Sequence, residues 1–161
     1  MSPQTELVQG TGAQRGSRPV HAMKRCVGVA PGRGATSGTY RHWGPWNDGG
    51  YRPPSAGPSQ EGSVQWFRYG RRTTSVEQIL EVDEPRRLAY AVVSGLPVKN
   101  YRADVTLTAT PSGGTSVRWS ASWDRTLLGK LVRRKLLKLY PDIVAALVAA
   151  SDQQVTSSPG Q

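Results

Sequence analysis

The sequence predicts an α+β fold in which an antiparallel β-sheet is covered on one face by a single C-terminal helix. Three observations support this fold class. Short segments rich in Val, Thr, Trp and Tyr follow one another after Gly62, and turn residues separate them. Apolar and polar residues alternate along the last two segments, as in a sheet with one covered face. Beyond them, apolar residues recur every three or four positions, which is the spacing of a helix face.

Five successive strands are expected after Gly62. They are residues 63–69, 73–82, 87–93, 101–110 and 115–123. Their short connections favour antiparallel neighbours, because a parallel pair needs a long crossover. Val105 alternates with Asp104 in the fourth segment, and Trp119 alternates with Arg118 in the fifth. We therefore expect Trp119 to face the interior of the domain.

The covering helix is predicted over residues 126–151. Its apolar stripe consists of Leu128, Val132, Leu136, Leu139, Ile143 and Leu147. Pro141 lies inside this stretch and lacks a backbone donor, so we expect a kink or a break near residues 139–140. Residues 152–161 are rich in Ser, Gln and Pro and are expected to form a flexible tail.

The first third of the chain has a different composition. Residues 1–62 hold 12 of the 18 glycines and 7 of the 12 prolines. Residues 1–38 show little apolar periodicity, and such a segment buries too little surface to offset its ordering entropy. We expect a poorly ordered segment over 1–38, apart from a short strand within 20–30, and a loop over 47–62. The domain proper is then 39–151.

Charge and cysteine content limit the classes of function. The chain carries 21 basic and 11 acidic residues, a net charge of +10, but the positive charge is spread along its length. A specific nucleic-acid partner is therefore not expected. Cys26 is the only cysteine, which excludes an internal disulfide and fits a cytoplasmic location. With two histidines and one cysteine we expect no metal site, and no motif points to a cofactor.

Three stretches carry a family resemblance. They are EQILEVDEPRRLAY at 77–90, SGLPVKNYRA at 94–103 and GTSVRW at 114–119. In this order and spacing they resemble the polyketide cyclase/dehydrase and lipid-transport family of the START/Bet v 1-like (SRPBCC) superfamily. The likeness covers roughly residues 40–151 and implies the helix-grip fold, a curved antiparallel sheet wrapped on a long C-terminal helix. Residues 1–38 lack the family's opening strand and helix, so we expect these elements to be missing or altered.

The resemblance implies that the chain binds an apolar small molecule, such as a lipid, a quinone or a polyketide-like aromatic compound. The ligand would lie in a hydrophobic cavity between the sheet and the helix. The expected lining, taken from the alternation and the helix stripe, is Tyr101, Val105, Leu107, Val117, Trp119, Trp123, Leu128, Val132 and Leu139. Trp66 is added because its indole N–H needs a partner, which a ligand can supply. Apolar walls with a few polar groups are typical of small-molecule sites.

Two alternatives stay open. An enzyme would be a cyclase or dehydratase acting on a polyketide-like substrate, and two or more ionisable groups buried in the cavity would favour it over a carrier. Glu77 could reach the rim, although we expect it to pair with an arginine on a neighbouring strand. The third reading is a protein whose basic helix face binds RNA, the ribosome or an anionic membrane. That face consists of Lys130, Arg133, Arg134, Lys135 and Lys138.

Overall fold

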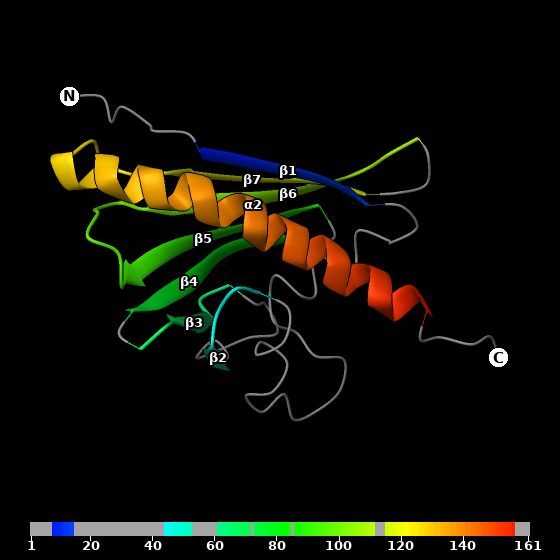
Figure 1. The fold of residues 1–161 in the computed structure, drawn as a ribbon, viewed down its shortest axis with the longest axis horizontal. Coiled ribbons are helices and arrows are strands. Elements are labelled where there is room, and N and C mark those ends of the chain that lie inside the picture. Colours follow the sequence, from blue (N-terminus) through cyan, green and yellow to red (C-terminus); the bar gives the residue numbers. More distant parts are fainter. Residues whose placement is uncertain are drawn as a thin grey trace.

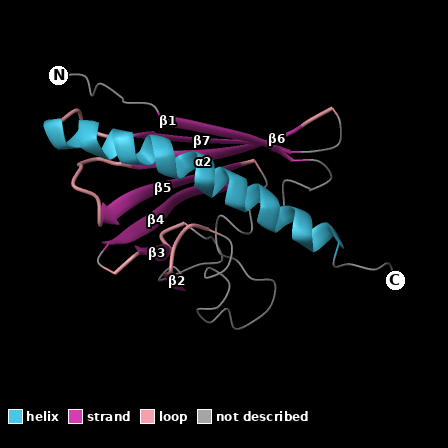
Figure 2. Ribbon diagram, in the orientation of Figure 1, coloured by secondary structure: helices cyan, strands magenta, loops and turns pink. Residues whose placement is uncertain are grey.

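One antiparallel sheet and one long helix make up the regular structure of the residues described here. The computed structural model describes residues 8–14, 44–52, 61–71, 73–84, 86–111 and 115–156. The strands are β1 (Val8–Gln14), β2 (Asp48–Arg52), β3 (Val64–Tyr69), β4 (Thr73–Asp83), β5 (Arg87–Ser94), β6 (Arg102–Ala109) and β7 (Thr115–Ser122). They are arranged in the order β1-β7-β6-β5-β4-β3-β2. The helix, α2 (Leu127–Thr156), crosses one face of this sheet (Figures 1 and 2). The predicted fold class is confirmed.

The five strands expected after Gly62 are confirmed as β3 to β7, with ends that differ by at most one residue. The loop expected over 47–62 is wrong in part, because β2 lies within it and pairs with β3. A side chain at Gly50 would collide with Trp66, since its Cβ would lie 2.5 Å from Nε1 of that ring. The glycines that let Trp66 lie against β2 also remove the apolar pattern by which a strand is recognised.

The opposite edge of the sheet is formed by β1, which pairs with β7 from Val8 opposite Ala121 to Gln14 opposite Thr115. For β1 the expectation of an unstructured segment over residues 1–38 is wrong. The sequence of β1, VQGTGAQ, lacks the apolar alternation by which a strand is recognised. The strand expected within 20–30 lies outside the described residues.

The core lies between the sheet and α2. Along β6 the buried residues are Ala103, Val105 and Leu107, and the residues between them are partly exposed. The same alternation runs along β7, where Trp119 is 7 % exposed and lies opposite Val105. Two register shifts in β4 interrupt its pairing with β5, and such bulges bend a strand and increase its twist.

The helix begins beside a side-chain cap. The hydroxyl of Thr126 accepts a hydrogen bond from the backbone N–H of Gly129 at 2.9 Å, which satisfies one of the free donors of the first turn. Of the kink or break expected near residues 139–140, the break does not occur, because α2 runs through Pro141 without interruption and continues to Thr156, past the predicted start of the tail. Tyr140 and Ile143 are both buried beside Pro141, so tertiary packing holds the helix where one hydrogen bond is missing.

The outer face of the sheet is polar. Arg87 and Arg102 each form ion pairs with both Glu81 and Asp104, at distances from 2.6 to 3.3 Å. All four side chains are partly exposed, and ion pairs in such positions contribute little to stability. The face opposite α2 is therefore solvated, and a ligand cavity belongs on the inner side.

Candidate ligand-binding site

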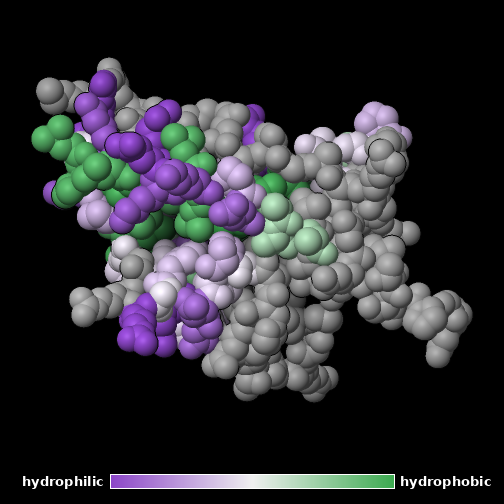
Figure 3. Space-filling model, viewed as in Figure 1, coloured by the Kyte–Doolittle hydropathy of each residue, from purple (hydrophilic) through white to green (hydrophobic). Residues whose placement is uncertain are grey.

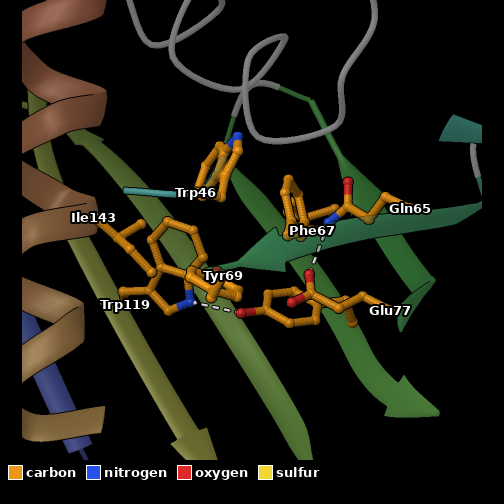
Figure 4. A pocket seen from close by; sticks show the side chains of 9 residues that line it. Trp46, Gln65, Phe67, Tyr69, Glu77, Trp119 and Ile143 are labelled. Carbon is orange, nitrogen blue, oxygen red and sulfur yellow. Dashed lines mark hydrogen bonds between the residues drawn. The ribbon is translucent and has the colours of Figure 1, made fainter. Parts of the chain in front are cut away.

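A small cavity lies between the strands β3 to β5, β7 and the second half of α2. Its described lining is Trp46, Gln65, Phe67, Tyr69, Glu77, Leu88, Tyr90, Trp119 and Ile143 (Figure 4). Its volume is about 20 Å³, which is enough for about one water molecule. Five of the nine lining side chains are aromatic, and one is a carboxyl group. A molecule larger than water therefore enters only if the walls move apart.

The carboxyl group of Glu77 is the most distinctive group in this lining. Its side chain is buried and accepts hydrogen bonds from the amide of Gln65 at 2.9 Å and from the hydroxyl of Ser75 at 3.2 Å. Burial raises the pKa of Glu77 to about 7, and the two hydrogen bonds offset this only in part. Glu77 therefore exchanges its proton near neutral pH, the range in which general acids and bases work best.

An aromatic network forms the wall beneath α2. The indole N–H of Trp119 donates to the hydroxyl oxygen of Tyr90 at 3.1 Å. Because an indole only donates, the Tyr90 hydroxyl accepts here and its own proton is left for another acceptor. The hydroxyls of Tyr101 and Tyr140 form a hydrogen bond with each other. Burial raises the pKa of all three tyrosines well above the usual value, so they are neutral donors.

Trp46 covers the cavity from the segment that precedes β2. Its ring centroid lies 4.5 Å from that of Phe67 and 6.3 Å from that of Tyr69, and Figure 4 shows it above these side chains. Gly44 makes this position accessible, because a Cβ there would lie 2.0 Å from the Trp46 ring. Trp46 therefore forms one wall of the cavity from a segment outside the strands of the sheet.

Of the ten residues expected to bind the ligand, Trp119 lines the cavity. A further group is buried in the core, outside this lining: Tyr101, Val105, Leu107, Val117, Trp123 and Val132. Leu139 is partly buried against the core. Leu128 is 55 % exposed, so its expected inward position is wrong. Trp66 points away from Gln65 and Phe67, its neighbours along β3, and stacks under the guanidinium of Arg68 at 5.6 Å.

The arginine partner expected for Glu77 is also wrong. On the neighbouring strands, Arg68 of β3 pairs with Asp48, and Arg87 of β5 pairs with Glu81 and Asp104 on the outer face. Glu77 instead shares the inner face with Ile79. In the sequence, the only sign that the carboxyl group of Glu77 faces inward was its position two residues before the apolar Ile79, on the same face of the strand. Within β3, Gln65 and Phe67 were missed because apolar rings lie on both faces, Trp66 on one and Phe67 on the other, so the alternation does not indicate the inner face.

Groups that would suggest another kind of site are absent from the described part of the chain. No cluster of three or more His, Cys, Asp or Glu side chains could hold a metal ion there. Nor does that part contain a helix that is long and apolar enough to cross a membrane. The two histidines of the chain, His21 and His42, and its cysteine, Cys26, lie outside the described residues.

The sequence profile of the family described as polyketide cyclase/dehydrase and lipid transport matches residues 18–151. The chain belongs to this family. The match starts at residue 18, whereas the resemblance was expected to start near residue 40. Residues 18–38 therefore also belong to the family's sequence pattern. No curated protein sequence matches the chain.

Solved structures of distant sequence share the fold. Norcoclaurine synthase from Thalictrum flavum, in complex with dopamine and hydroxybenzaldehyde, is 14% identical and superposes with a TM-score of 0.68, covering 99% of this chain and 91% of that chain. A protein from Nitrosospira multiformis gives 0.68 at 16% identity, over 94% and 99%. One from Thermobifida fusca gives 0.61 at 20% identity, over 91% and 93%. The helix-grip fold expected from the sequence is confirmed.

Proposed function

We propose that this family member binds a small, largely aromatic or apolar molecule in the cavity beneath α2, with one polar group of the ligand directed at Glu77. The lining supports this proposal, because apolar and aromatic walls with one placed polar group are typical of small-molecule sites. The family description, which includes lipid transport, and the aromatic compounds bound by norcoclaurine synthase point to the same ligand class. The lone Cys26 favours the cytoplasm as the place of binding.

Binding requires the cavity to open, because its volume is about 20 Å³. We place this opening at Trp46, since the other side chains of the lining belong to β3, β4, β5, β7 and α2. Displacing Trp46 exposes the rings of Phe67 and Tyr69 to the incoming molecule. The ligand then replaces the aromatic contacts that Trp46 gives up, which keeps the energetic cost of opening low.

Phenol and toluene provide a matched pair of probes, because they share a shape and differ by one hydroxyl. Phenol should bind about tenfold more tightly than toluene above pH 7, since a hydrogen bond to a charged group is worth about 1.5 kcal/mol or more. Titrations followed by tryptophan fluorescence measure both. The affinity should be insensitive to salt, because apolar burial is not screened.

Glu77→Gln should abolish the preference for phenol, whereas Glu81→Gln should leave it intact. The second variant is the matched control, because Glu81 lies on the same strand and faces outward. Wild-type protein that binds neither probe, or a phenol preference that persists in Glu77→Gln, would contradict the proposal.

The buried carboxyl also favours a second candidate, an enzyme that cyclises or dehydrates a polyketide-like substrate. Glu77 would remove a proton from carbon next to a carbonyl, and the Tyr90 hydroxyl would donate to the resulting enolate oxygen. The test is deuterium incorporation at the central carbon of a 1,3-diketone, followed by NMR. An accelerated exchange that Glu77→Gln removes and Glu81→Gln retains would support catalysis, and a rate equal to that of buffer would exclude it for this substrate class.

A further inference from the structure

The first turns of α2 expose a group of leucines that the core does not use. Leu127 is 82 % exposed, Leu131 is 58 % exposed and Leu128 is 55 % exposed. On the same helix Val132 and Leu136 are buried against the sheet. The helix therefore has an apolar inner stripe and a second, solvated set of leucines. Exposed apolar side chains grouped in this way mark surfaces that contact a partner.

Basic residues surround these leucines. Lys130, Arg133, Arg134, Lys135 and Lys138 are all exposed. Leu127, Leu131, Arg134 and Lys138 follow one another at spacings of three or four, so they form one outward stripe. The first acidic residue of α2 is Asp142. Within the described residues none of the five cations forms an ion pair. We refer to the three leucines and five cations as the leucine-basic surface.

Folding does not account for this arrangement. The first turn of α2 has no acidic residue and carries Lys130, although the helix macrodipole favours negative charge at that end. All three leucines are more than half exposed, and the cations form no ion pair within the described residues. Figure 3 shows hydrophobic and hydrophilic side chains interleaved over this end of α2, at the left of the view.

Three occupants compete for such a surface, and its chemistry separates them. A second copy of the same surface would bring five cations against five, which is repulsive. A nucleic acid would neutralise the cations but would gain nothing from the leucines, and the surface offers no aromatic ring for a base to stack on. An anionic bilayer satisfies both parts, because leucines insert into the acyl boundary while Lys and Arg remain at the phosphates.

We propose that the leucine-basic surface of α2 docks the protein on an anionic lipid bilayer. The docked helix lies in the plane of the interface, with Leu127 and Leu131 towards the acyl chains and the five cations at the headgroups. The cavity is lined by the opposite side of α2, through Ile143, so docking leaves the ligand site unobstructed. The proposal goes beyond the ligand-binding function and does not depend on it.

Vesicle co-sedimentation tests this inference with two lipid compositions. The protein should bind vesicles of phosphatidylcholine mixed with phosphatidylglycerol and should not bind pure phosphatidylcholine vesicles. Arg134→Glu with Lys138→Glu should lower the partition coefficient by more than about tenfold, because each cation near an anionic surface contributes about 1 kcal/mol. Leu127→Ser with Leu131→Ser should lower it by about tenfold at unchanged net charge. Raising the salt concentration should lower the partition coefficient of the wild type, because salt screens the cations. The part of the binding that the leucines contribute should remain.

Matched controls exclude effects of total charge and of general hydrophobicity. Arg86→Glu with Arg118→Glu makes the same charge change at exposed positions outside α2, and Val93→Ser removes an exposed apolar side chain from β5. Both should bind vesicles like the wild type. Equal losses in the controls would overturn the proposal. So would binding of poly(U) RNA without vesicle binding, or a dimer in analytical ultracentrifugation that the leucine variant dissociates.

Discussion

The inner face of the sheet has two regions that differ in their buried groups. Over β6 and β7 the interior is filled by side chains such as Val105 and Val117, which are 0 % exposed and carry no polar atom. Over β3 and β4 the same face holds Gln65 and Glu77, both buried. The first region is mostly apolar, and the second supplies the amide and the carboxyl group of the cavity lining.

Neighbouring strands of one sheet face can therefore be selected for different properties. Stability favours apolar buried side chains, whereas ligand binding favours a buried polar group. A buried carboxyl is costly even when it is hydrogen-bonded, so stability alone favours an apolar residue at position 77. Gln65 and Ser75 reduce that cost without removing it, as the raised pKa of Glu77 shows. Polar groups kept in such a place suit an interaction with a ligand.

The largest effect is expected where the two regions meet, at Trp119. Replacing it with alanine removes a buried ring and the hydrogen bond that Tyr90 accepts. Trp119→Ala should lower the free energy of unfolding by about 3 to 5 kcal/mol, measured by urea denaturation. Trp66→Ala on the outer side of β3 is the control and should cost about 1 kcal/mol or less. Equal losses would mean that the two faces of the sheet are not distinguished by burial.

The second largest effect is the pH dependence of stability that Glu77 causes in the region of β3 and β4. Burial raises the pKa of Glu77 from 4.5 to about 7. Between these values the unfolded chain releases the proton while the folded chain keeps it, so Glu77 makes stability fall as pH rises, and the fall ends above pH 7. In the wild type, Glu77 should lower the free energy of unfolding by about 3 kcal/mol over this window. Glu77→Gln should abolish this decrease, which urea denaturation at about pH 5 and pH 8 measures.

Glu81→Gln serves as the control for the pH experiment. The hydrogen bond from Arg102 lowers the pKa of Glu81, so its contribution to stability is present near neutral pH and is lost as pH falls. The sign is opposite to that of Glu77, and the effect is small because Glu81 is exposed. If wild-type stability is flat between about pH 5 and pH 8, Glu77 is not protonated in the folded chain.

A smaller effect is expected in the hydroxyl pair of Tyr101 and Tyr140. Tyr101→Phe leaves the buried Tyr140 hydroxyl without this partner, and the converse holds for Tyr140→Phe. Each should cost about 1 to 3 kcal/mol, whereas the double variant should cost less than the sum, because no unpaired partner then remains. Strict additivity in the double-mutant cycle would show that the two hydroxyls do not depend on each other.

The sequence by itself determined the elements that repeat on a short period. Alternation along β6 and β7 located both strands and placed Trp119 inside. The three- and four-residue spacing located α2, and the stretches at 77–90, 94–103 and 114–119 indicated the family. Each of these signals is carried by neighbours in the chain, so it is visible before any tertiary contact forms.

Only the tertiary structure decided which faces carry the site. Trp66 was expected inside because its indole N–H needs a partner, but Gln65 and Phe67 line the cavity and Trp66 lies over Gly50 of β2. Sequence assigned Leu128 to the buried stripe, whereas the rotation of α2 on the sheet leaves it exposed.

β1 and β2 were missed for a related reason. Both contain glycines and little apolar pattern, and they exist because β7 and β3 offer them hydrogen bonds. Strand pairing and helix rotation depend on contacts between residues far apart in the chain, and local periodicity carries no information about those contacts.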